Sequence, residues 1–499
     1  MNKKIEISIN KIRDSSGVAF GTSGVRGEIS RMTDFVCYSY VQAFLKYIGT
    51  LGEFAPGDIV ALGGDLRSST PRILMACADA VQKLGGRPVF CGHVPTPALA
   101  AYSIAQKIPS LMVTGSHIPD DRNGIKFYRP QGEVLKGDEA GITSQHIVVN
   151  HELFDANDQL IAPASLPPIT DVSEDYVARY VNFFGADALT GLRIGVYQHS
   201  AVGRDLLVRI VSELGGTPLV LGRSAHFIPV DTEAIRPEDT AAALSWAEKY
   251  ATDAIISTDG DSDRPLLANE AGEWVRGDRL GILCAQALKA DHVVTPITSN
   301  TALELVMDSN AVTRTRIGSP FVIEAMNAAI ARGHKRVCGY EANGGFLLGS
   351  DITLDGRRLS ALPTRDAVLP VVAALVAARK SGGLIALESN LPSRTTYSDR
   401  IERIAPNVLK KLFSYLLDSD SATANERLAI SFSGSNNGLS VVDLTDGIRM
   451  TMADGTIIHL RGSGNSPELR CYTEASTFAR ARQANKQTLQ AVLALLKLV

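Results

Sequence analysis

The feature that most constrains the fold is an internal repeat in the 499-residue chain. Residues 58–92, DIVALGGDLRSSTPRILMACADAVQKLGGRPVFCG, are echoed by residues 192–222, LRIGVYQHSAVGRDLLVRIVSELGGTPLVLG. Both begin with an apolar stretch, continue with an amphipathic stretch, and end in LGGxP, an apolar run and a further glycine. This pattern predicts a strand, a helix and a second strand joined by a right-handed crossover. We therefore expect a chain built from repeated α/β domains.

Linker and turn signals divide the rest of the chain. The proline-rich residues 163–168 predict a linker, and the apolar run after Asp291 predicts a third α/β segment. Residues 437–455 instead contain Asn-Gly and Asp-Gly turns between short alternating stretches. They predict an antiparallel meander, followed by a helix over residues 475–499. We expect three α/β domains with mixed sheets and a smaller C-terminal α+β domain, at residues 1–165, 166–288, 289–392 and 393–499.

Charge and cysteine content exclude several classes of partner. A formal net charge of −3 provides no basic surface for nucleic acid or an anionic membrane, so we expect a small-molecule partner. Six cysteines without a CxxC pair are typical of reduced cytoplasmic thiols and indicate no zinc site. The N-terminus lacks a signal-peptide pattern, and the longest apolar stretch, residues 369–378, is too short to span a bilayer. These features predict a cytoplasmic protein.

The first motif that carries chemistry is LMVTGSHIPDDRNGIKFY, residues 111–128. Its apolar start predicts a strand that ends at Gly115 and presents Ser116 and His117, where open α/β sheets bind ligands. Lys126 returns a positive charge to the same region after an Asn-Gly turn. A serine at such a junction is more often a local hydrogen-bonding group. The neighbouring glycine and lysine favour a nucleophile instead.

The second motif, AIISTDGDSDRPLL, places a run of carboxylates directly after a buried strand. The residues are Asp259, Asp261 and Asp263, followed by Arg264. Carboxylates at this spacing repel one another and predict a site for a hard divalent cation. An EF-hand with Glu270 at its last position is an alternative, although Arg264 stands where that loop needs glycine. A solvated acidic turn is the other alternative.

Three further motifs carry polar groups on glycine-rich loops. GYEANGGFLLG presents Glu341 and Asn343, which could hydrogen-bond sugar hydroxyls, although a polar turn is the commoner explanation. GTSGVRG near the N-terminus presents Arg26. HLRGSGNSPELRCYTEA predicts an anion-binding loop with guanidinium, hydroxyl and backbone donors. The donors of that loop are Arg461, Ser463, Gly464, Asn465, Ser466 and Arg470.

These five motifs, in this order, resemble those of the α-D-phosphohexomutases, most closely the phosphomannomutase/phosphoglucomutase branch. The corresponding family patterns are TASHNP with NGxK, DGDxDR, GEESGG or GEMSGH, and RxSGTEPxxRxYxE. The resemblance implies four domains around a central cleft and an isomerase that interconverts hexose 1-phosphate and hexose 6-phosphate. It further implies a phosphorylated Ser116, a bisphosphorylated sugar intermediate and a hexose 1,6-bisphosphate activator.

The resemblance also implies roles for individual residues. Mg²⁺ would bind the phosphoserine oxygen and the three aspartates. Arg26, His117 and Lys126 would stabilise charge and assist proton transfer, with Arg264 and Arg316 lining the site. Glu341 and Asn343 would hold sugar hydroxyls, and the Arg461 loop would bind the remote phosphate. This sequence departs from the family pattern at Gly115, Ile118, Asn343, Gly345, Asn465 and Ser466.

The GTSGVRG opening favours mannose phosphate as the substrate, whereas EANGG is similar to the loop of N-acetylglucosamine-phosphate mutases. A phosphoglucomutase or an (N-acetyl)glucosamine-phosphate mutase with the same mechanism is therefore an alternative. Two other classes remain. A metal-dependent phosphatase would use the same serine and aspartates, and a non-catalytic sugar-phosphate sensor would tolerate the substituted loops.

Overall fold

The computed structural model describes residues 4–21, 23–417, 420–432, 438–462 and 468–497. It forms two compact units. The first contains Met1–Val294 and Gly318–Ser389, and the second contains Thr295–Ile317 and Asn390–Val499. The bounds of the four predicted domains stay predictions.

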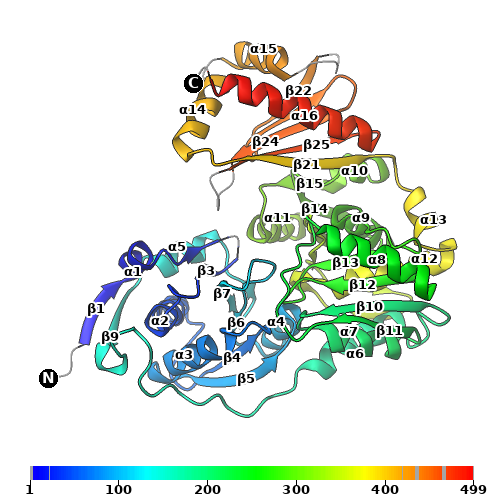
Figure 1. Cartoon of the computed structure of the whole chain (residues 1–499). Helices are drawn as coiled ribbons and strands as arrows, with labels where there is room; N and C mark the ends of the chain where they lie inside the picture. The colour runs from blue at the N-terminus through cyan, green and yellow to red at the C-terminus, as the bar shows by residue number, and fades with distance from the viewer. Residues whose placement is uncertain (1–3, 22, 418–419, 433–437, 463–467, 498–499) are drawn as a thin grey trace. The chain divides into compact units, whose positions relative to one another are not determined.

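The first sheet of the first unit contains the first copy of the repeat (Figure 1). Its strand order is β2 (Ala19–Phe20), β3 (Val25–Glu28), β7 (Arg122–Arg129), β6 (Ser110–Val113), β4 (Ile59–Gly64) and β5 (Arg87–His93), with β8 (Gly132–Glu133) paired to β7. Its helices are α1 (Ile9–Ser16), α2 (Asp34–Thr50), α3 (Thr70–Lys83), α4 (Thr96–Gln106) and α5 (Lys136–Thr143). An antiparallel pair, β1 (Lys4–Ser8) and β9 (His146–Asn150), precedes the short helix η1 (His151–Leu153).

The alternation of side chains along β4 explains why helices cover both faces of this sheet. Val60 and Leu62 pack in one core with residues of α2 and α3. Ala61 packs in another core with Met112 of β6 and Leu99 of α4. Because β4 is buried on both faces, its sequence is a continuous apolar run rather than an alternating one.

The second sheet confirms the repeat. Its order is β11 (Thr217–Arg223), β10 (Arg193–His199), β12 (Ala254–Thr258) and β13 (Pro265–Ala268), with helices α6 (Ser173–Phe184), α7 (Arg204–Glu213) and α8 (Pro237–Tyr250). In both copies the two strands are parallel and joined by a helix. Gly85 and Gly215 occupy the same position after that helix, with φ of 79° and 83°. This left-handed conformation explains the shared glycine.

The third sheet mixes parallel and antiparallel pairs. Within it, β14 (His292–Pro296) pairs in parallel with β16 (Val337–Tyr340). The strand β17 (Phe346–Leu348) pairs antiparallel with β16 and with β20 (Leu362–Asp366). A hairpin of β18 (Ile352–Leu354) and β19 (Arg357–Leu359) connects them. The helices are α9 (Gly277–Ala287), α11 (Ser319–Ala331), α12 (Val368–Ser381) and α13 (Leu384–Ser389).

The second unit contains the expected antiparallel meander. Its sheet order is β21 (Thr395–Glu402), β25 (Glu468–Ala475), β24 (Ile457–Gly462), β23 (Ile448–Met452) and β22 (Leu439–Asp443). The expected C-terminal helix is α16 (Phe478–Leu495), and α14 (Pro406–Leu417) and α15 (Ser421–Phe432) share its core. The unit also contains α10 (Ala302–Val306), η2 (Ser309–Ala311) and β15 (Val312–Thr315).

Across the described ranges, no helix combines the length and the apolar character that a membrane span needs. The apolar stretch at residues 369–378 lies within α12, where most of its side chains are buried in the first unit.

Candidate active site

Ser116 follows β6 in an unusual backbone conformation. Its φ is 56°, in the left-handed region that residues with a side chain rarely adopt. Its backbone N–H donates to Thr114 Oγ1 at 2.8 Å, and its carbonyl accepts from Arg67 Nη2 at 2.9 Å. The residue is 1% exposed. Its surroundings therefore hold the hydroxyl in a defined position, as is common for strained residues at functional sites.

Arg67 holds the whole loop in place. It is buried, pairs with Asp65 at 3.2 Å, and donates to the carbonyls of Ser116, Ile118, Pro119 and Arg122. A Cβ on Gly115 would lie 2.7 Å from the Cζ atom of Arg67. An alanine at this position would therefore displace the guanidinium of Arg67.

The three aspartates converge on Ser116. Their ligand oxygens all lie within 4.8 Å of one another. Ser116 Oγ donates to Asp259 Oδ2 at 2.6 Å, and the other oxygen of Asp259 accepts two backbone N–H groups of its own loop. The Oδ2 atoms of Asp261 and Asp263 each accept from Lys126 Nζ, at 2.6 and 2.5 Å.

One oxygen of each of two aspartates accepts no hydrogen bond from the described residues, although Asp263 Oδ1 lies 3.7 Å from Arg264 Nε. Among the described residues, Asp261 Oδ1 and Asp263 Oδ1 are buried and have no hydrogen bond. A buried carboxylate oxygen without a partner is costly. One carboxylate oxygen from each of the three aspartates belongs to a cluster of hard donors that fits a divalent cation such as Mg²⁺.

The electrostatics agree with this arrangement. Burial and the charges of Asp261 and Asp263 raise the pKa of Asp259 well above its usual value. Burial opposes ionisation of Asp263 too, yet Arg365 and Lys126 lower its pKa overall. Lys126 likewise lowers the pKa of Asp261 against the effect of burial. Of the three carboxylates, Asp259 is therefore the one whose negative charge the surrounding cations offset least. Asp259 is also the aspartate that contacts Ser116.

The EF-hand alternative is excluded by Glu270. Its carboxylate accepts hydrogen bonds from the backbone N–H groups of Leu384 and Ile385 at the start of α13. The position that would close a calcium loop therefore serves another contact. The three aspartates are also buried between β12 and β13, which excludes a solvated acidic turn.

Arg26, Arg264 and His117 complete the surroundings of Ser116. Arg26 Nη2 is buried without a hydrogen-bond partner among the described residues. Burial and the charge of Arg264 lower the pKa of Arg26 to about 10. The Nδ1 atom of His117 lies 3.0 Å from Arg264 Nη1 and 3.4 Å from Ser116 Oγ. Burial and Arg264 lower the pKa of His117 to about 3, so the imidazole is neutral and its Nδ1 accepts from Arg264.

The predicted sugar loop lies in the same unit. Glu341 is buried, and its Oε2 atom accepts from Arg365 Nη1 at 3.0 Å. Asn343 Oδ1 accepts from the backbone N–H of Gly345 at 3.0 Å, which orients the amide within the turn. A Cβ on Gly345 would lie 2.6 Å from the Cδ atom of Arg365. Arg365 therefore occupies the space that a side chain at position 345 would need.

Arg365 is a functional residue that the sequence analysis missed. It is 1% exposed and lies near the end of β20. Its guanidinium donates to Asp263 Oδ2 and Glu341 Oε2, both at 3.0 Å, and to the hydroxyls of Ser319 and Ser23. It thus joins the metal loop to the sugar loop. The strand-end position that identified Ser116 is the signal that could also have identified Arg365.

The remaining predicted residues lie in the second unit. Arg461 pairs with Asp446 at 2.9 Å, and Arg470 pairs with Glu468 at 2.8 Å. Arg316 donates to the carbonyl of Thr445 at 3.3 Å. The predicted donors Ser463, Gly464, Asn465 and Ser466 lie outside the described residues.

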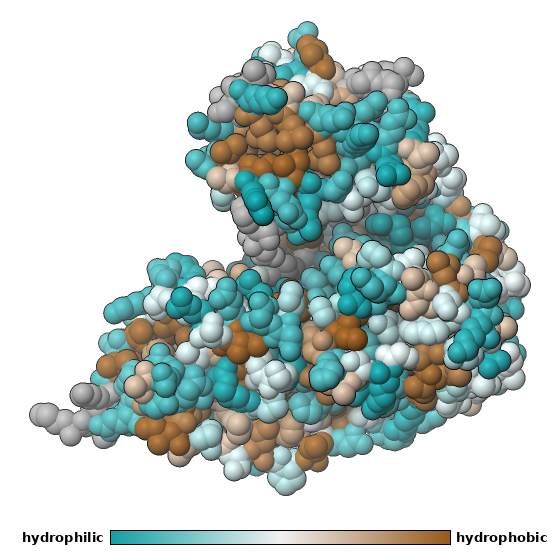
Figure 2. Space-filling view, in the orientation of Figure 1, coloured by the Kyte–Doolittle hydropathy of each residue, from teal (hydrophilic) through white to brown (hydrophobic). Residues whose placement is uncertain are grey.

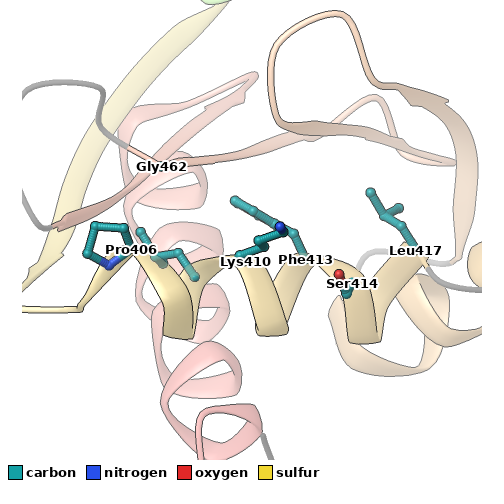
Figure 3. A pocket seen from close by; sticks show the side chains of 7 residues that line it. Pro406, Lys410, Phe413, Ser414, Leu417 and Gly462 are labelled. Atoms are coloured by element: carbon teal, nitrogen blue, oxygen red, sulfur yellow. The ribbon is translucent and has the colours of Figure 1, made fainter.

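A groove of about 660 Å³ lies beside Gly462, where β24 ends (Figure 3). Its other lining residues all belong to α14: Pro406, Leu409, Lys410, Phe413, Ser414 and Leu417. Figure 2 shows hydrophobic residues gathered on this part of the second unit, next to the position of α14 in Figure 1. The groove is apolar apart from Lys410 and Ser414, and therefore differs in chemistry from the Ser116 site.

Comparison with known proteins identifies the family. Residues 17–147 match the description "Phosphoglucomutase/phosphomannomutase, alpha/beta/alpha domain I", and residues 276–393 match domain III of the same family. A phosphomannomutase of Salmonella muenchen is 43% identical over 464 residues, which cover 93% of each chain. The chain belongs to the phosphoglucomutase/phosphomannomutase family. It is accordingly a phosphohexomutase, an isomerase, as the motifs indicate.

Other relatives agree with this membership. A phosphomannomutase of Sinorhizobium fredii is 43% identical over 472 residues, covering 92% of this chain and 95% of the relative. A phosphoglucomutase/phosphomannomutase family protein of Burkholderia thailandensis has a TM-score of 0.73 at 20% identity, covering 98% of both chains. The phosphoglucomutase parafusin of Paramecium has a TM-score of 0.69 at 16% identity, and the match covers 96% of this chain and 94% of parafusin. The structural neighbours confirm the mixed α/β fold.

Proposed function

We propose that this phosphohexomutase interconverts mannose 1-phosphate and mannose 6-phosphate through a phosphorylated Ser116. The observation that carries the proposal is the position of Ser116 Oγ, 2.6 Å from Asp259 in a buried cluster of carboxylates and cations. Phosphoserine would give its phosphoryl group to the free hydroxyl of the sugar phosphate, forming a bisphosphorylated sugar. The P–O bond to the opposite sugar oxygen would then break, and that phosphoryl group would return to Ser116.

Mg²⁺ is the cofactor that these residues support. Asp259, Asp261 and Asp263 would hold it together with the phosphoserine oxygen. When bound, the ion supplies positive charge against the phosphoryl oxygens. A structural neighbour, the N-acetylphosphoglucosamine mutase of Aspergillus fumigatus, is described in complex with GlcNAc-6P and magnesium.

The basic residues around Ser116 would stabilise the transferring group. Arg26 has a buried Nη2 without a partner among the described residues, so it is suited to a phosphoryl oxygen. Lys126 holds Asp261 and Asp263 in position and offsets their repulsion. His117 is neutral and fixed by Arg264, so it would orient the reacting hydroxyl rather than add charge.

The substrate would be held at both ends. Glu341 and Asn343 would hydrogen-bond ring hydroxyls, because Arg365 orients one carboxylate oxygen of Glu341 and leaves the other for a ligand. Arg461, Arg470 and the loop donors Ser463, Gly464, Asn465 and Ser466 would bind the phosphate that is not reacting. Arg316 would contribute positive charge to that phosphate subsite.

Mannose is the preferred sugar because both relatives at 43% identity are phosphomannomutases. A phosphoglucosamine mutase of Sorangium cellulosum is 29% identical over 469 residues. Hexose 1,6-bisphosphate would prime Ser116. A complex of an Aspergillus fumigatus N-acetylphosphoglucosamine mutase with glucose 1,6-bisphosphate has been solved. We further propose a cytoplasmic location, which the six buried free cysteines support.

The test is ³¹P NMR of the purified enzyme with Mg²⁺ and catalytic hexose 1,6-bisphosphate. Mannose, glucose, glucosamine and N-acetylglucosamine 1-phosphates are offered in turn. We expect the mannose 1-phosphate resonance to be replaced fastest by a 6-phosphate resonance. Ser116→Ala should abolish the change, whereas Ser103→Ala, a buried serine of α4, should retain it. Faster conversion of another sugar would contradict the mannose assignment, and accumulation of inorganic phosphate would indicate a phosphatase.

A further inference from the structure

The first unit contains a cavity among α4, α6 and the β19–β20 segment. Its volume is about 520 Å³, within the range of small-molecule sites. The helix α4 packs against α6 and β20, and α6 packs against β19, so these elements enclose it. None of the described residues that line it belongs to the Ser116 site. Ala98, Ala101, Val172 and Leu362 form an apolar wall.

Arg179 of α6 is the unusual member of this lining. Its Nε and Nη2 atoms are buried and have no hydrogen-bond partner among the described residues. A guanidinium is always charged and carries five N–H donors, and burying such donors unsatisfied is unfavourable. This arrangement is expected where a ligand supplies the missing acceptors.

The neighbouring groups do not satisfy Arg179. Asp175 lies one helical turn earlier and also lines the cavity, yet it is exposed and forms none of the ion pairs found among the described residues. The hydroxyls of Tyr176 and Tyr180 both donate to Asp366, at 3.2 and 2.7 Å. The carboxylate of Asp351 is engaged by the backbone N–H of Ala361 and by Arg358, which lower its pKa, and the charge of Arg179 is the last of the contributions to that shift.

We propose that this cavity binds a small organic anion. Its carboxylate, sulfonate or phosphate group would accept hydrogen bonds from Arg179. Its apolar body would lie against the alanines of α4 and Leu362. Asn182 and Gln106 supply further polar groups to the lining. Arg358 is an exposed second cation, already paired with Asp351, and therefore contributes less than Arg179.

Two elements that line the cavity also contact residues that hold the aspartate loop of residues 259–263. The first residue of α4, Thr96, donates its hydroxyl to Asp261 at 2.5 Å. Tyr176 lines the cavity and donates to Asp366, the residue after Arg365. An anion in this cavity would therefore contact elements that also hold the active site, although it would not occupy the site.

The test uses the full-length enzyme and 8-anilinonaphthalene-1-sulfonate, a fluorescent sulfonate with an aromatic body. We expect saturable fluorescence enhancement in the wild type. Arg179→Met should weaken it at least tenfold, because a charge-assisted hydrogen bond is lost. Arg358→Met, the matched cation at the same cavity, should weaken it about twofold. Asp175→Asn should strengthen it about twofold, because a competing carboxylate is removed.

Two controls separate binding from folding and from the active site. Arg26→Met should leave dye binding unchanged, because Arg26 lies in the Ser116 site. Without dye, Arg179→Met should unfold at the same temperature as the wild type or higher, because an unsatisfied buried charge is removed. Equal dye affinity of the wild type and Arg179→Met would overturn the proposal. A lower unfolding temperature of Arg179→Met without dye would also overturn it, because Arg179 would then serve the fold.

Discussion

The Ser116 site and the arginines of the second unit differ in how their charges are held. Around Ser116, the cations Arg67, Lys126 and Arg365 are at most 3% exposed and each contacts a carboxylate. In the second unit, the side chains of Arg461 and Arg470 are 21% and 38% exposed, and each pairs with one acidic neighbour. Under the proposed function, Ser116 would transfer the phosphoryl group, which needs preorganised charge away from water. Arg461 and Arg470 would bind a remote phosphate, which needs cations that can exchange partners.

The largest expected effect on stability comes from Lys126. Lys126→Met leaves Asp261 and Asp263 without their shared cation in a buried site, which should cost about 3–5 kcal/mol of unfolding free energy. Urea unfolding measures this loss. Arg470→Met, which breaks a part-exposed pair, should cost less than about 1 kcal/mol. Equal costs would remove the distinction between the two regions.

Added Mg²⁺ should change the unfolding free energies of Lys126→Met and Arg470→Met differently. The cation should restore part of the stability of Lys126→Met, because it offsets the repulsion between the aspartates. It should leave Arg470→Met unchanged relative to the wild type. If Mg²⁺ stabilised neither the wild type nor Lys126→Met, the aspartate cluster would not be a metal site.

The next effect concerns the close packing of Gly345 against Arg365. Gly345→Ala should displace the guanidinium and reduce kcat/KM by about 10–100-fold, as expected for misplaced catalytic groups. In an Arg365→Ala background the same change should have little further effect, because the obstructing side chain is gone. Gly137→Ala is the matched control, since a Cβ there meets no atom within 4 Å. Additive losses would contradict the coupling.

Arg461 should affect binding more than chemistry. Arg461→Met should raise KM for the sugar phosphate by about tenfold or more, because a charge-assisted contact to phosphate is removed. Its stability should change by less than about 1 kcal/mol. Steady-state kinetics give the split between KM and kcat. A fall in kcat at unchanged KM would place Arg461 in the transfer step.

The smallest expected effect is a pH dependence of the second unit. Burial lowers the pKa of His459 from 6.5 to about 4 in the folded protein. The unfolded chain therefore binds more protons between these values, and stability should fall as pH decreases from 6.5 to 4. The loss is at most about 1.4 kcal/mol per pH unit. Between pH 7 and 4.5, urea unfolding should show a smaller loss of unfolding free energy for His459→Gln than for the wild type.

Sequence patterns predicted the local parts of this molecule well. The repeat predicted both parallel strand pairs, because strand and helix periodicities are local properties. The spacing of the aspartates correctly predicted that their carboxylates converge, and the family resemblance, not the spacing, implied that they lie beside Ser116.

The contacts that hold the site were not predictable in the same way. Arg67 acts on carbonyls 49–55 residues later, and Arg365 contacts Asp263 across 102 residues. Such contacts depend on tertiary packing rather than on a local period. The same holds for Gly115 and Gly345, whose departures from the family pattern are explained only by the arginines beside them.

The location of the phosphoryl group shows most directly whether Ser116 is the residue that carries it. The enzyme is incubated with Mg²⁺ and mannose 1,6-bisphosphate, digested, and its peptides are analysed by tandem mass spectrometry. We expect one phosphoryl group on Ser116, transferred from the bisphosphate, and no phosphorylated peptide from Ser116→Ala enzyme treated in the same way. Phosphate on another residue, or turnover by an enzyme that never carries phosphate on Ser116, would show that Ser116 does not carry the transferred group.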